Sequence, residues 1–443
     1  MKTIPELNRI YHGDCVETMR NWPDNCVDAV VTDPPYGIRF MGKAWDGADI
    51  DRQARKREGQ KPSKAKDGRM RPNPRQCRSE AAGTYDLAPE SMRNFQMWTA
   101  AWAAEALRVL KPGGHLLAFA STRTYHRMAC GVEDAGFEIR DKVEWLYGSG
   151  FPKSLDVSKA IDKRNGDKRP VVEKIIGPKP GDHGGSGKYG HGNDRSVTSA
   201  ASAASAAWGG WGTALKPASE PVVVARKPLD GTVAANVLRW GTGALNIGAA
   251  RIESKDDQLQ EKYDSVQKAG TRTNSIYGAD ARDRAGATPH EGGRWPTNVL
   301  LDQYAAGMLD ARAPGASRFF YVAKPDRGER NMGLDGEAEL SGGTATDRED
   351  GTAGLRSPRA GAGRTGGIKN FHSTVKPVDV MAYLIQLITP RGVVVLDPFM
   401  GSGTTAIAAA RLGHPYLGCE MSAEYVGLAD KRIAKETAQG KMF

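Results

Sequence analysis

Short apolar runs alternate with helix-length amphipathic segments in the first third of the chain. Residues 1–38 are predicted to form a strand in "RIYHGD", a helix in "CVETMRNWP" and a strand in "VDAVVTD". Further along lie an amphipathic segment over Ser91 to Leu110, the apolar run "HLLAFAS", a helical stretch to Gly136 and the strand-like "FEIRDKVEWLYG". Because helices separate short buried strands, this alternation predicts an α/β fold with a largely parallel sheet covered on both faces.

The last 70 residues show the same alternation. Helical spacing in "KPVDVMAYLIQLIT" precedes a buried strand in "RGVVVLDPF" and a glycine-rich turn that opens a helix in "MGSGTTAIAAARLG". A strand in "HPYLGCE" and a closing helix in "AEYVGLADKRIAKE" complete the segment. This order is half of a nucleotide-binding unit and fits an open, doubly wound sheet.

The middle of the chain has a different character. Residues 181–213 are low-complexity Gly, Ser and Ala, which bury too little apolar surface to fold alone, and we predict no structure there. Strand-like pieces return at "PVVVARKPL" and "RFFYVAKP", and a second glycine-rich tract covers 341–367. We interpret 155–370 as an inserted, irregular second domain between the two α/β segments, 1–154 and 371–443.

Composition and charge add a candidate nucleic-acid contact. The chain has 443 residues, 53 of them glycine, and a net charge of +10. Residues 51–78 hold eleven Lys or Arg against three Asp or Glu, within a predicted basic loop at 39–90. A solvated loop is one interpretation, and an arm that follows DNA phosphates is the favoured one. Its candidate DNA-binding residues are Arg55, Lys56, Arg57 and Lys61.

The cysteine spacing, the lack of a long apolar run and the isolated histidines argue against several classes of protein. The five cysteines form no C-x-x-C pair, which argues against a disulfide framework or zinc cluster and fits a reducing cytoplasm. No apolar run approaches the length of a membrane span, so a soluble cytoplasmic protein without membrane contact is expected. His183 and His191 lack accompanying cysteines or carboxylates, and no metal is expected.

The stretch "TDPPYG" places chemistry directly after an apolar run. Two prolines fix φ twice and remove two N–H donors, which gives a stiff turn whose carbonyls lie outside a regular ladder. If 27–32 is a strand, the turn lies beyond its carboxyl end, where open α/β sheets bind ligands. The Asp33 carboxylate and a proline carbonyl can accept hydrogen bonds from one amino group, and Tyr36 can stack. The turn therefore predicts a receptor for a planar ring with an exocyclic NH₂.

The stretch "LDPFMGSGTTA" reads as strand, glycines and helix. Gly401-x-Gly403-x-x-Ala406 formally matches the dinucleotide fingerprint, and Glu420 at the tip of the next strand can accept hydrogen bonds from ribose hydroxyls. A tight turn without a ligand and an NAD enzyme remain as alternative interpretations. Nothing else in the sequence offers a hydride-transfer site.

Together, "DPPY" and "FMGSG" resemble the signatures of S-adenosylmethionine-dependent amino-group DNA methyltransferases, (D/N/S)PP(Y/F/W) and F-x-G-x-G. The first motif precedes the second by about 360 residues, which is similar to the circularly permuted β group of these enzymes. Glutamine and RNA guanine methyltransferases have the opposite order and NPPY-like turns, so they are less similar. Fragments such as "TALKPASEP" and "GRWPTN" look like phage and prophage members. The resemblance implies a Rossmann-like methyltransferase fold with a target-recognition region in the middle.

The resemblance also implies roles for individual residues. Asp33 and the Pro34 carbonyl would hold the target amino group in the Pro34–Pro35 turn, and Tyr36 would stack on a base flipped out of the duplex. The residues implied at S-adenosylmethionine are Phe399, Gly401, Gly403 and Thr404 around the methionine part, Asp397 and Pro398 before them, Glu420 at the ribose, Asp14 at the adenine, and Lys376. A helix cap is the alternative role for Asp14, and an ordinary first-turn lysine is the alternative for Lys376. Neither a metal nor a covalent nucleophile is needed.

The activity that the resemblance implies is methylation of the N6 amino group of adenine in duplex DNA, because in the enzymes that this chain resembles Asp at the first motif position usually accompanies adenine. N4 of cytosine is the alternative, and an RNA or protein methyltransferase or a silent DNA-binding relative is more remote. Duplex DNA is the expected partner, and a cognate restriction endonuclease is a further one. We also expect the Asp397 strand to lie beside the Asp33 strand. The sequence indicates neither the recognition site nor the oligomeric state.

Overall fold

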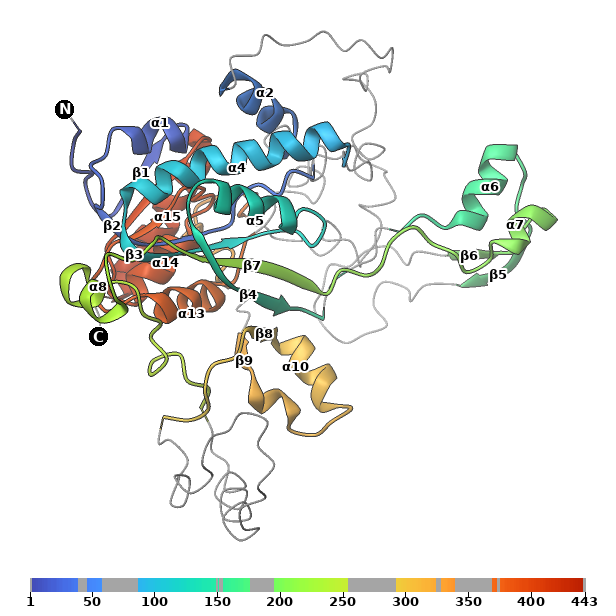
Figure 1. Cartoon of the computed structure of the whole chain (residues 1–443). Helices are drawn as coiled ribbons and strands as arrows, with labels where there is room; N and C mark the ends of the chain where they lie inside the picture. The colour runs from blue at the N-terminus through green and yellow to red at the C-terminus, as the bar shows by residue number, and fades with distance from the viewer. Residues whose placement is uncertain are drawn as a thin grey trace, which may run out of the picture.

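The structure is a computed structural model that describes residues 2–38, 46–57, 87–148, 150, 154–175, 195–253, 292–323, 328–338, 369–372 and 375–440. A nine-stranded sheet runs through this described part, with helices on both faces (Figure 1). In spatial order its strands are β1 (Arg9–His12), β11 (Tyr416–Glu420), β10 (Val395–Asp397), β2 (Val27–Thr32), β3 (Leu110–Phe119), β7 (Ser219–Arg226), β4 (Glu138–Leu146), β8 (Val299–Asp302) and β9 (Tyr321–Ala323). The predicted α/β, mostly parallel architecture is confirmed.

The sheet interleaves the two ends of the chain. β10 pairs in parallel with β2, with Val395 opposite Ala29 and Leu396 opposite Val30, and β11 fits between β10 and β1. This confirms the expected neighbourhood of the Asp33 and Asp397 strands. Because the carboxyl ends of parallel strands meet at one edge, the turns that follow β2 and β10 lie together. Among these strands only β7 runs antiparallel to its neighbours, β3 and β4.

Helices cover both faces of the sheet because its strands alternate their side chains between two apolar cores. On β2, Ala29 and Val31 join one core and Val30 joins the other. The first core packs under α13 (Val378–Ile388), α14 (Thr404–Arg411) and α15 (Ala423–Gly440), and the second under α1 (Cys15–Arg20), α2 (Ala48–Arg57), α4 (Pro89–Val109) and α5 (Tyr125–Asp134). In the described part of the chain, no helix is long and apolar enough to cross a membrane.

The predicted boundaries of the middle domain require correction. β7, β8 and β9 all fall within 155–370, yet they belong to the main sheet rather than to a separate insertion. The apolar run Val222–Val224 is buried between β3 and β4 and contributes side chains to both apolar cores. The remaining described elements of this region are α6 (Val157–Asn165), β5 (Val171–Ile175), β6 (Arg195–Thr198), α7 (Ala203–Ala207), α8 (Val233–Trp240), α10 (Gln303–Asp310) and a 3₁₀ turn, η4 (Ala316–Phe319).

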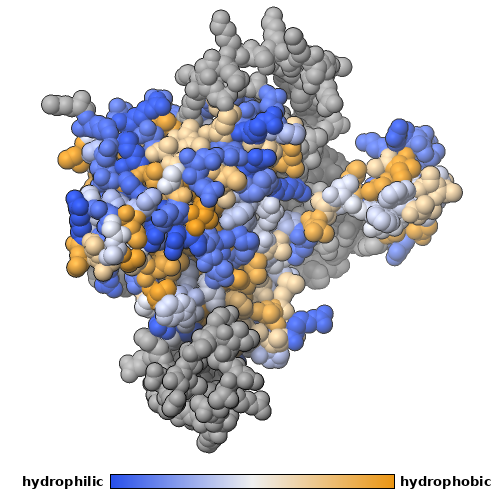
Figure 2. Space-filling view, in the orientation of Figure 1, coloured by the Kyte–Doolittle hydropathy of each residue, from blue (hydrophilic) through white to orange (hydrophobic). Residues whose placement is uncertain are grey.

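A small unit of α6, β5, β6 and α7 projects from the body of the molecule (Figure 1). It includes part of the low-complexity stretch 181–213, where we predicted no structure. Ser202 and Ser205 form a capping box that starts α7, and the buried Asp162 carboxylate accepts hydrogen bonds from Ser202 and from Arg169. Polar capping thus orders a segment that has little apolar surface. Figure 2 shows hydrophobic residues on this unit, and Val171 and Val172 of β5 are exposed.

Part of the predicted basic loop at 39–90 is a docked helix. In α2 the side chains of Ile50 and Ala54 are buried against α4, and Trp98 Nε1 donates a hydrogen bond to Gln53 Oε1 at 2.9 Å. The backbone of the candidate DNA-binding residues 55–57 is the last turn of this helix. Lys61 lies outside the described residues, so the phosphate-binding role of the basic arm stays a prediction.

Candidate active site

The turn Asp33–Tyr36 directly follows β2, and side chains from other parts of the chain hold its end in place by hydrogen bonds. The buried Asp46 carboxylate accepts hydrogen bonds from the backbone N–H of Gly37 at 2.7 Å and of Ile38 at 3.3 Å. Thr124 Oγ1 donates to the Tyr36 carbonyl at 2.7 Å. These contacts fix the end of the turn without using its prolines. Among the described residues, no donor reaches the carbonyl of Pro34.

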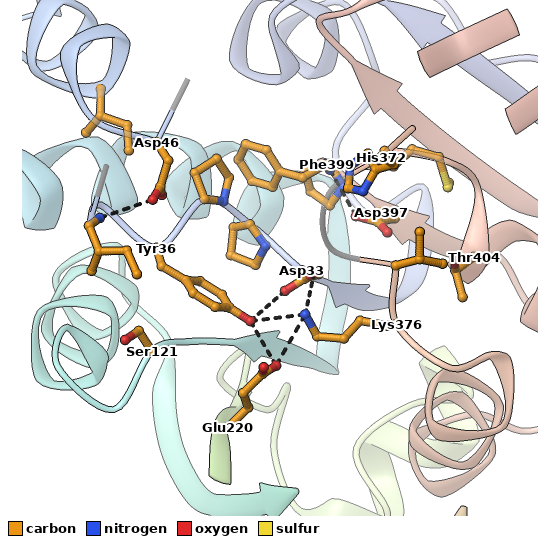
Figure 3. Close-up of a pocket in the computed structure, with 18 of the residues that line it drawn as sticks. Asp33, Tyr36, Asp46, Ser121, Glu220, His372, Lys376, Asp397, Phe399 and Thr404 are labelled. Carbon is orange, nitrogen blue, oxygen red and sulfur yellow. Dashed lines mark hydrogen bonds and ion pairs between the residues drawn. The ribbon is translucent and has the colours of Figure 1, made fainter. Parts of the chain in front are cut away.

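Lys376 joins the Asp33–Tyr36 turn to a second carboxylate, that of Glu220 (Figure 3). Lys376 Nζ lies 2.6 Å from Asp33 Oδ2, 3.1 Å from the Tyr36 hydroxyl and 3.3 Å from Glu220 Oε2. The Tyr36 hydroxyl lies 2.9 Å from Asp33 Oδ1 and 3.2 Å from Glu220 Oε2. We call these four side chains the Lys376 cluster. The described polar contacts of Lys376 are thus with the Asp33–Tyr36 turn and Glu220, whereas we had predicted it at the cofactor.

Burial and neighbouring charges together shift the pKa values of Lys376 and Tyr36. Burial lowers the pKa of Lys376, but the Asp33 and Glu220 carboxylates outweigh that effect, and its pKa is raised above the ordinary value. Burial and the same two carboxylates raise the pKa of the Tyr36 hydroxyl well above its usual range. Lys376 is therefore an ammonium and Tyr36 a neutral hydrogen-bond donor at neutral pH.

Glu220 is a site residue that the sequence analysis missed. It lies at the start of β7, within the fragment "TALKPASEP" that drew notice only for its phage-like appearance. The β7 strand pairs with β3, whose neighbour β2 carries Asp33, so the sheet brings Glu220 to the Asp33–Tyr36 turn across almost 190 residues of sequence. The order of strands, which the local pattern does not contain, was the missing signal.

On the other side of the site, Asp397 connects the sheet to the turn at residues 399–403, which we call the glycine turn. Its buried carboxylate accepts hydrogen bonds from Thr32 Oγ1 at 2.6 Å, from the Phe399 N–H at 2.9 Å and from Thr405 Oγ1. Burial is the main reason that the pKa of Asp397 is raised to about 6. These contacts connect β10, β2 and α14, so the Asp397 carboxylate fixes the position of the glycine turn through hydrogen bonds.

The raised pKa of Asp397 predicts a pH-dependent stability. The native state binds the proton of the Asp397 carboxyl more tightly than the unfolded chain does. Protonation of Asp397 therefore stabilises the native state fully below pH 4, and this stabilisation is lost as pH rises through about 6. The free energy of unfolding of the wild type, relative to Asp397→Asn, should fall by roughly 2–3 kcal/mol across this window. Urea unfolding of both proteins at pH 4.5 and 7.5 measures the difference. A difference that does not change with pH would contradict the assignment.

Glu420, the last residue of β11, is hydrogen-bonded to Gly401 of the glycine turn. Glu420 Oε2 accepts a hydrogen bond from the Gly401 N–H at 2.8 Å, and its Oε1 accepts one from the Ser422 N–H at 2.8 Å. Burial raises the pKa of Glu420. Gly401 has φ +55°, and a Cβ there would lie 2.8 Å from His372 Nε2. The backbone at Gly401 thus passes closer to its surroundings than a residue with a side chain allows.

The other predicted cofactor residues lie around the same turn. Phe399 packs between Trp98 and Trp102 of α4, with both ring centroids 5.4 Å away. Asp14 caps α1 by accepting hydrogen bonds from the N–H groups of Val16 and Glu17, which is the alternative role considered above. Thr404 is the first residue of α14.

A cavity of about 1070 Å³ joins the two turns and is large enough for a nucleoside ligand together with a base. The predicted residues that line it are Asp14, Asp33, Pro34, Pro35, Tyr36, Lys376, Asp397, Pro398, Phe399, Gly401, Thr404 and Glu420, and Gly403 is not among them. The close-packed glycine turn and the carboxylate of Glu420 suit a ligand with hydroxyl donors. Among the described residues, no group of three or more His, Cys, Asp or Glu could hold a metal ion.

Comparison with known proteins gives the family of the chain. A family model described as "DNA methylase", N6_N4_Mtase, matches residues 27–431 and so covers both turns. The chain belongs to this family. It is an amino-group DNA methyltransferase whose methyl donor is S-adenosylmethionine, as the two motifs predicted.

Individual relatives are distant. Type II methyltransferase M.HindIII of Haemophilus influenzae is 22% identical over 433 residues, which are 97% of this chain and 96% of that protein. The solved structure of the M1.HpyAVI–SAM complex is 16% identical, with a TM-score of 0.36, over 96% of this chain and 98% of that one. PvuII DNA methyltransferase, which is cytosine-N4-specific, is 12% identical with a TM-score of 0.40, over 97% and 89%.

Proposed function

We propose that this protein methylates the exocyclic N6 of adenine at specific sites in duplex DNA, by flipping the base and transferring the methyl group in line. The observation that carries the proposal is that the Asp33–Tyr36 turn and the glycine turn line the same cavity. A planar base with an amino group fits the acceptors of the first turn. S-adenosylmethionine, when bound, supplies an activated methyl group.

The residues of the first turn hold the amino group for attack. The Asp33 carboxylate accepts one N–H, the Pro34 carbonyl accepts the other, and the ring of Tyr36 stacks on the base. Two acceptors on one amino group orient its lone pair toward the methyl group, which lowers the entropic part of the barrier. The contacts of Asp46 and Thr124 keep the turn in position for this task.

The identity of the base is tested by digesting methylated DNA to nucleosides and separating them by mass spectrometry. We expect N6-methyladenine from DNA treated with wild-type protein and none from DNA treated with the Asp33→Ala variant. N4-methylcytosine without N6-methyladenine would establish the alternative product. Cytosine is the alternative substrate because the same two acceptors would hold its N4 amino group.

We further propose duplex DNA as the macromolecular substrate and a cognate restriction endonuclease as a functional partner. M.HindIII is named a type II methyltransferase, and its likeness to this chain supports the second proposal. Such an enzyme would work in the cytoplasm of a bacterium or a phage-infected host.

The projecting unit and the basic arm are candidates for target recognition and phosphate contact, respectively. A shallower salt dependence of DNA binding after Arg55, Lys56, Arg57 and Lys61 are replaced by Ala would support the arm.

Glu420→Ala should weaken S-adenosylmethionine binding by about 1–3 kcal/mol, or on the order of 5- to 150-fold in Kd, because charge-assisted hydrogen bonds to ribose hydroxyls are lost. Titration calorimetry on the full chain measures the effect. Glu424→Ala, which removes an exposed carboxylate from the nearby first turn of α15, should leave the affinity unchanged. Equal affinity in wild type and Glu420→Ala would remove Glu420 from the cofactor site.

A further inference from the structure

Both carboxylate oxygens of Asp33 already accept hydrogen bonds within the protein. Tyr36 donates to Oδ1 at 2.9 Å and Lys376 donates to Oδ2 at 2.6 Å. A carboxylate has about four lone-pair positions, so it can accept one more donor. Its strength as an acceptor, however, falls when a buried ammonium neutralises it. The buried Lys376 therefore opposes the role that the proposed function gives to Asp33.

Glu220 reduces this effect of Lys376 on Asp33, because the Lys376 ammonium also pairs with the Glu220 carboxylate. Lys376 Nζ lies 3.3 Å from Glu220 Oε2, and the side chain of Lys376 is only 7% exposed, so its charge is divided between two carboxylates. The single Tyr36 hydroxyl hydrogen is also within reach of both. With Asp33 and Glu220 ionised and Lys376 protonated, the cluster carries one net negative charge. Without Glu220 it would carry none.

This charge count matters for the proposed reaction. Methyl transfer moves positive charge from the sulfonium onto the amino nitrogen, which then loses one N–H proton to solvent. A net negative cluster beside that nitrogen stabilises the developing charge, and its effect is large because the groups are buried. A neutral cluster would stabilise it much less.

We propose that Glu220 is a positioning residue that balances the charge of Lys376 and so keeps Asp33 a strong acceptor for the target amino group. The inference rests on the proposed function of Asp33 and adds a member to its site. Glu220 acts through Lys376 and Tyr36, and it need not touch the base. Lys376 in turn keeps the two carboxylates together, since they would otherwise repel each other.

Single-turnover methyl transfer tests the proposal, with excess full-length protein, labelled S-adenosylmethionine and bulk unmethylated duplex DNA. Glu220→Gln should slow transfer at least tenfold because the cluster becomes neutral. Combining it with Lys376→Met should restore most of the lost rate, because Asp33 alone again gives one negative charge. Glu220→Asp, which keeps the charge, should stay within a few-fold of wild type. A merely structural role predicts instead that the double variant is slower than Glu220→Gln.

The pH–rate profile gives a second readout. Lys376→Met leaves two carboxylates bridged only by the Tyr36 hydroxyl, and like charges raise each other's pKa. The acid limb of the profile should therefore move to higher pH in Lys376→Met and return when Glu220→Gln is added. His372 and Asp397 also interact with Asp33 by charge, and His372 is coupled to Lys376 as well. A shift of the acid limb that came from His372 would persist in the double variant, which also lacks Lys376, so the return of the limb there assigns the shift to the two carboxylates.

The controls separate this inference from the proposed function. Glu138→Gln removes a carboxylate that pairs with Arg226 near the other end of β7, and it should not change the rate. Calorimetric affinity for S-adenosylmethionine shows that each variant has a folded cofactor site. If wild type transfers no methyl group to DNA, the proposed function fails. If wild type is active and Glu220→Gln matches it, or the double variant shows no rescue, only the role of Glu220 fails.

Discussion

Asp33→Ala is expected to abolish measurable methyl transfer, with a rate loss on the order of 10²–10³-fold or more. The carboxylate is the acceptor that holds the target amino group, and alanine offers no replacement. The variant also leaves the buried ammonium of Lys376 with Glu220 as its remaining carboxylate. Transfer of labelled methyl from S-adenosylmethionine to duplex DNA measures the loss directly.

Binding should survive the same substitution. The glycine turn is anchored by Asp397 through Thr32 and Thr405, and Asp33 takes no part in those hydrogen bonds. Calorimetry should therefore give nearly wild-type affinity for S-adenosylmethionine, and a mobility shift should still show DNA binding. If Asp33→Ala retained transfer within tenfold of wild type, the acceptor role would be wrong. Loss of cofactor affinity would instead assign Asp33 to the cofactor site.

Elements with strong local patterns could be predicted from the sequence. β2 runs over Val27–Thr32, as the apolar run before "DPPY" predicted, and α14 begins directly after the glycines. In each case the signal is contained in a few consecutive residues. The adjacency of β2 and β10 could also be predicted, because both turns had to serve one site.

Features that depend on distant contacts could not be predicted in this way. The β7 strand is a good apolar run, but its place between β3 and β4 depends on pairing across about 100 residues on one side. The surrounding glycine-rich sequence hid that connection and led us to assign β7 to an insertion. Glu220 was missed for the same reason, since only the assembled sheet brings it to Lys376.

Polar docking contacts were also invisible in the pattern. α2 lies in a segment dominated by charge, yet its residues Ile50 and Ala54 are buried against α4. Two side chains of α4, Trp98 and Asn94, also donate hydrogen bonds to it. Asp46 likewise has no sequence signature, because its function is to accept hydrogen bonds from the backbone of the turn after β2. Such residues are recognised only when their partners are known.

Gly403→Val is expected to lower the free energy of unfolding by about 2–5 kcal/mol, because two costs add. Gly403 has φ +85°, a conformation that costs a residue with a side chain roughly 1–2 kcal/mol. A Cβ at this position would also lie 2.9 Å from Ala429 Cβ, 3.2 Å from Ala429 Cα and 3.3 Å from Ile433 Cδ1 on α15. Overpacking of this kind typically costs about 1–3 kcal/mol more. The glycine is thus required where α14 packs against α15, although we predicted it at the cofactor.

Urea unfolding measures this effect, and the other end of α14 offers a matched control. Gly413 has φ +74° with nothing within 4 Å of its Cβ position, so Gly413→Val bears the backbone cost alone. The difference between the two variants isolates the contact with α15 and should be about 1–3 kcal/mol. Affinity for S-adenosylmethionine should fall in Gly403→Val, because the turn shifts away from Ala429 and takes Gly401 and Phe399 with it. Equal stability of the two variants, with cofactor affinity lost only in Gly403→Val, would show that Gly403 serves the cofactor directly.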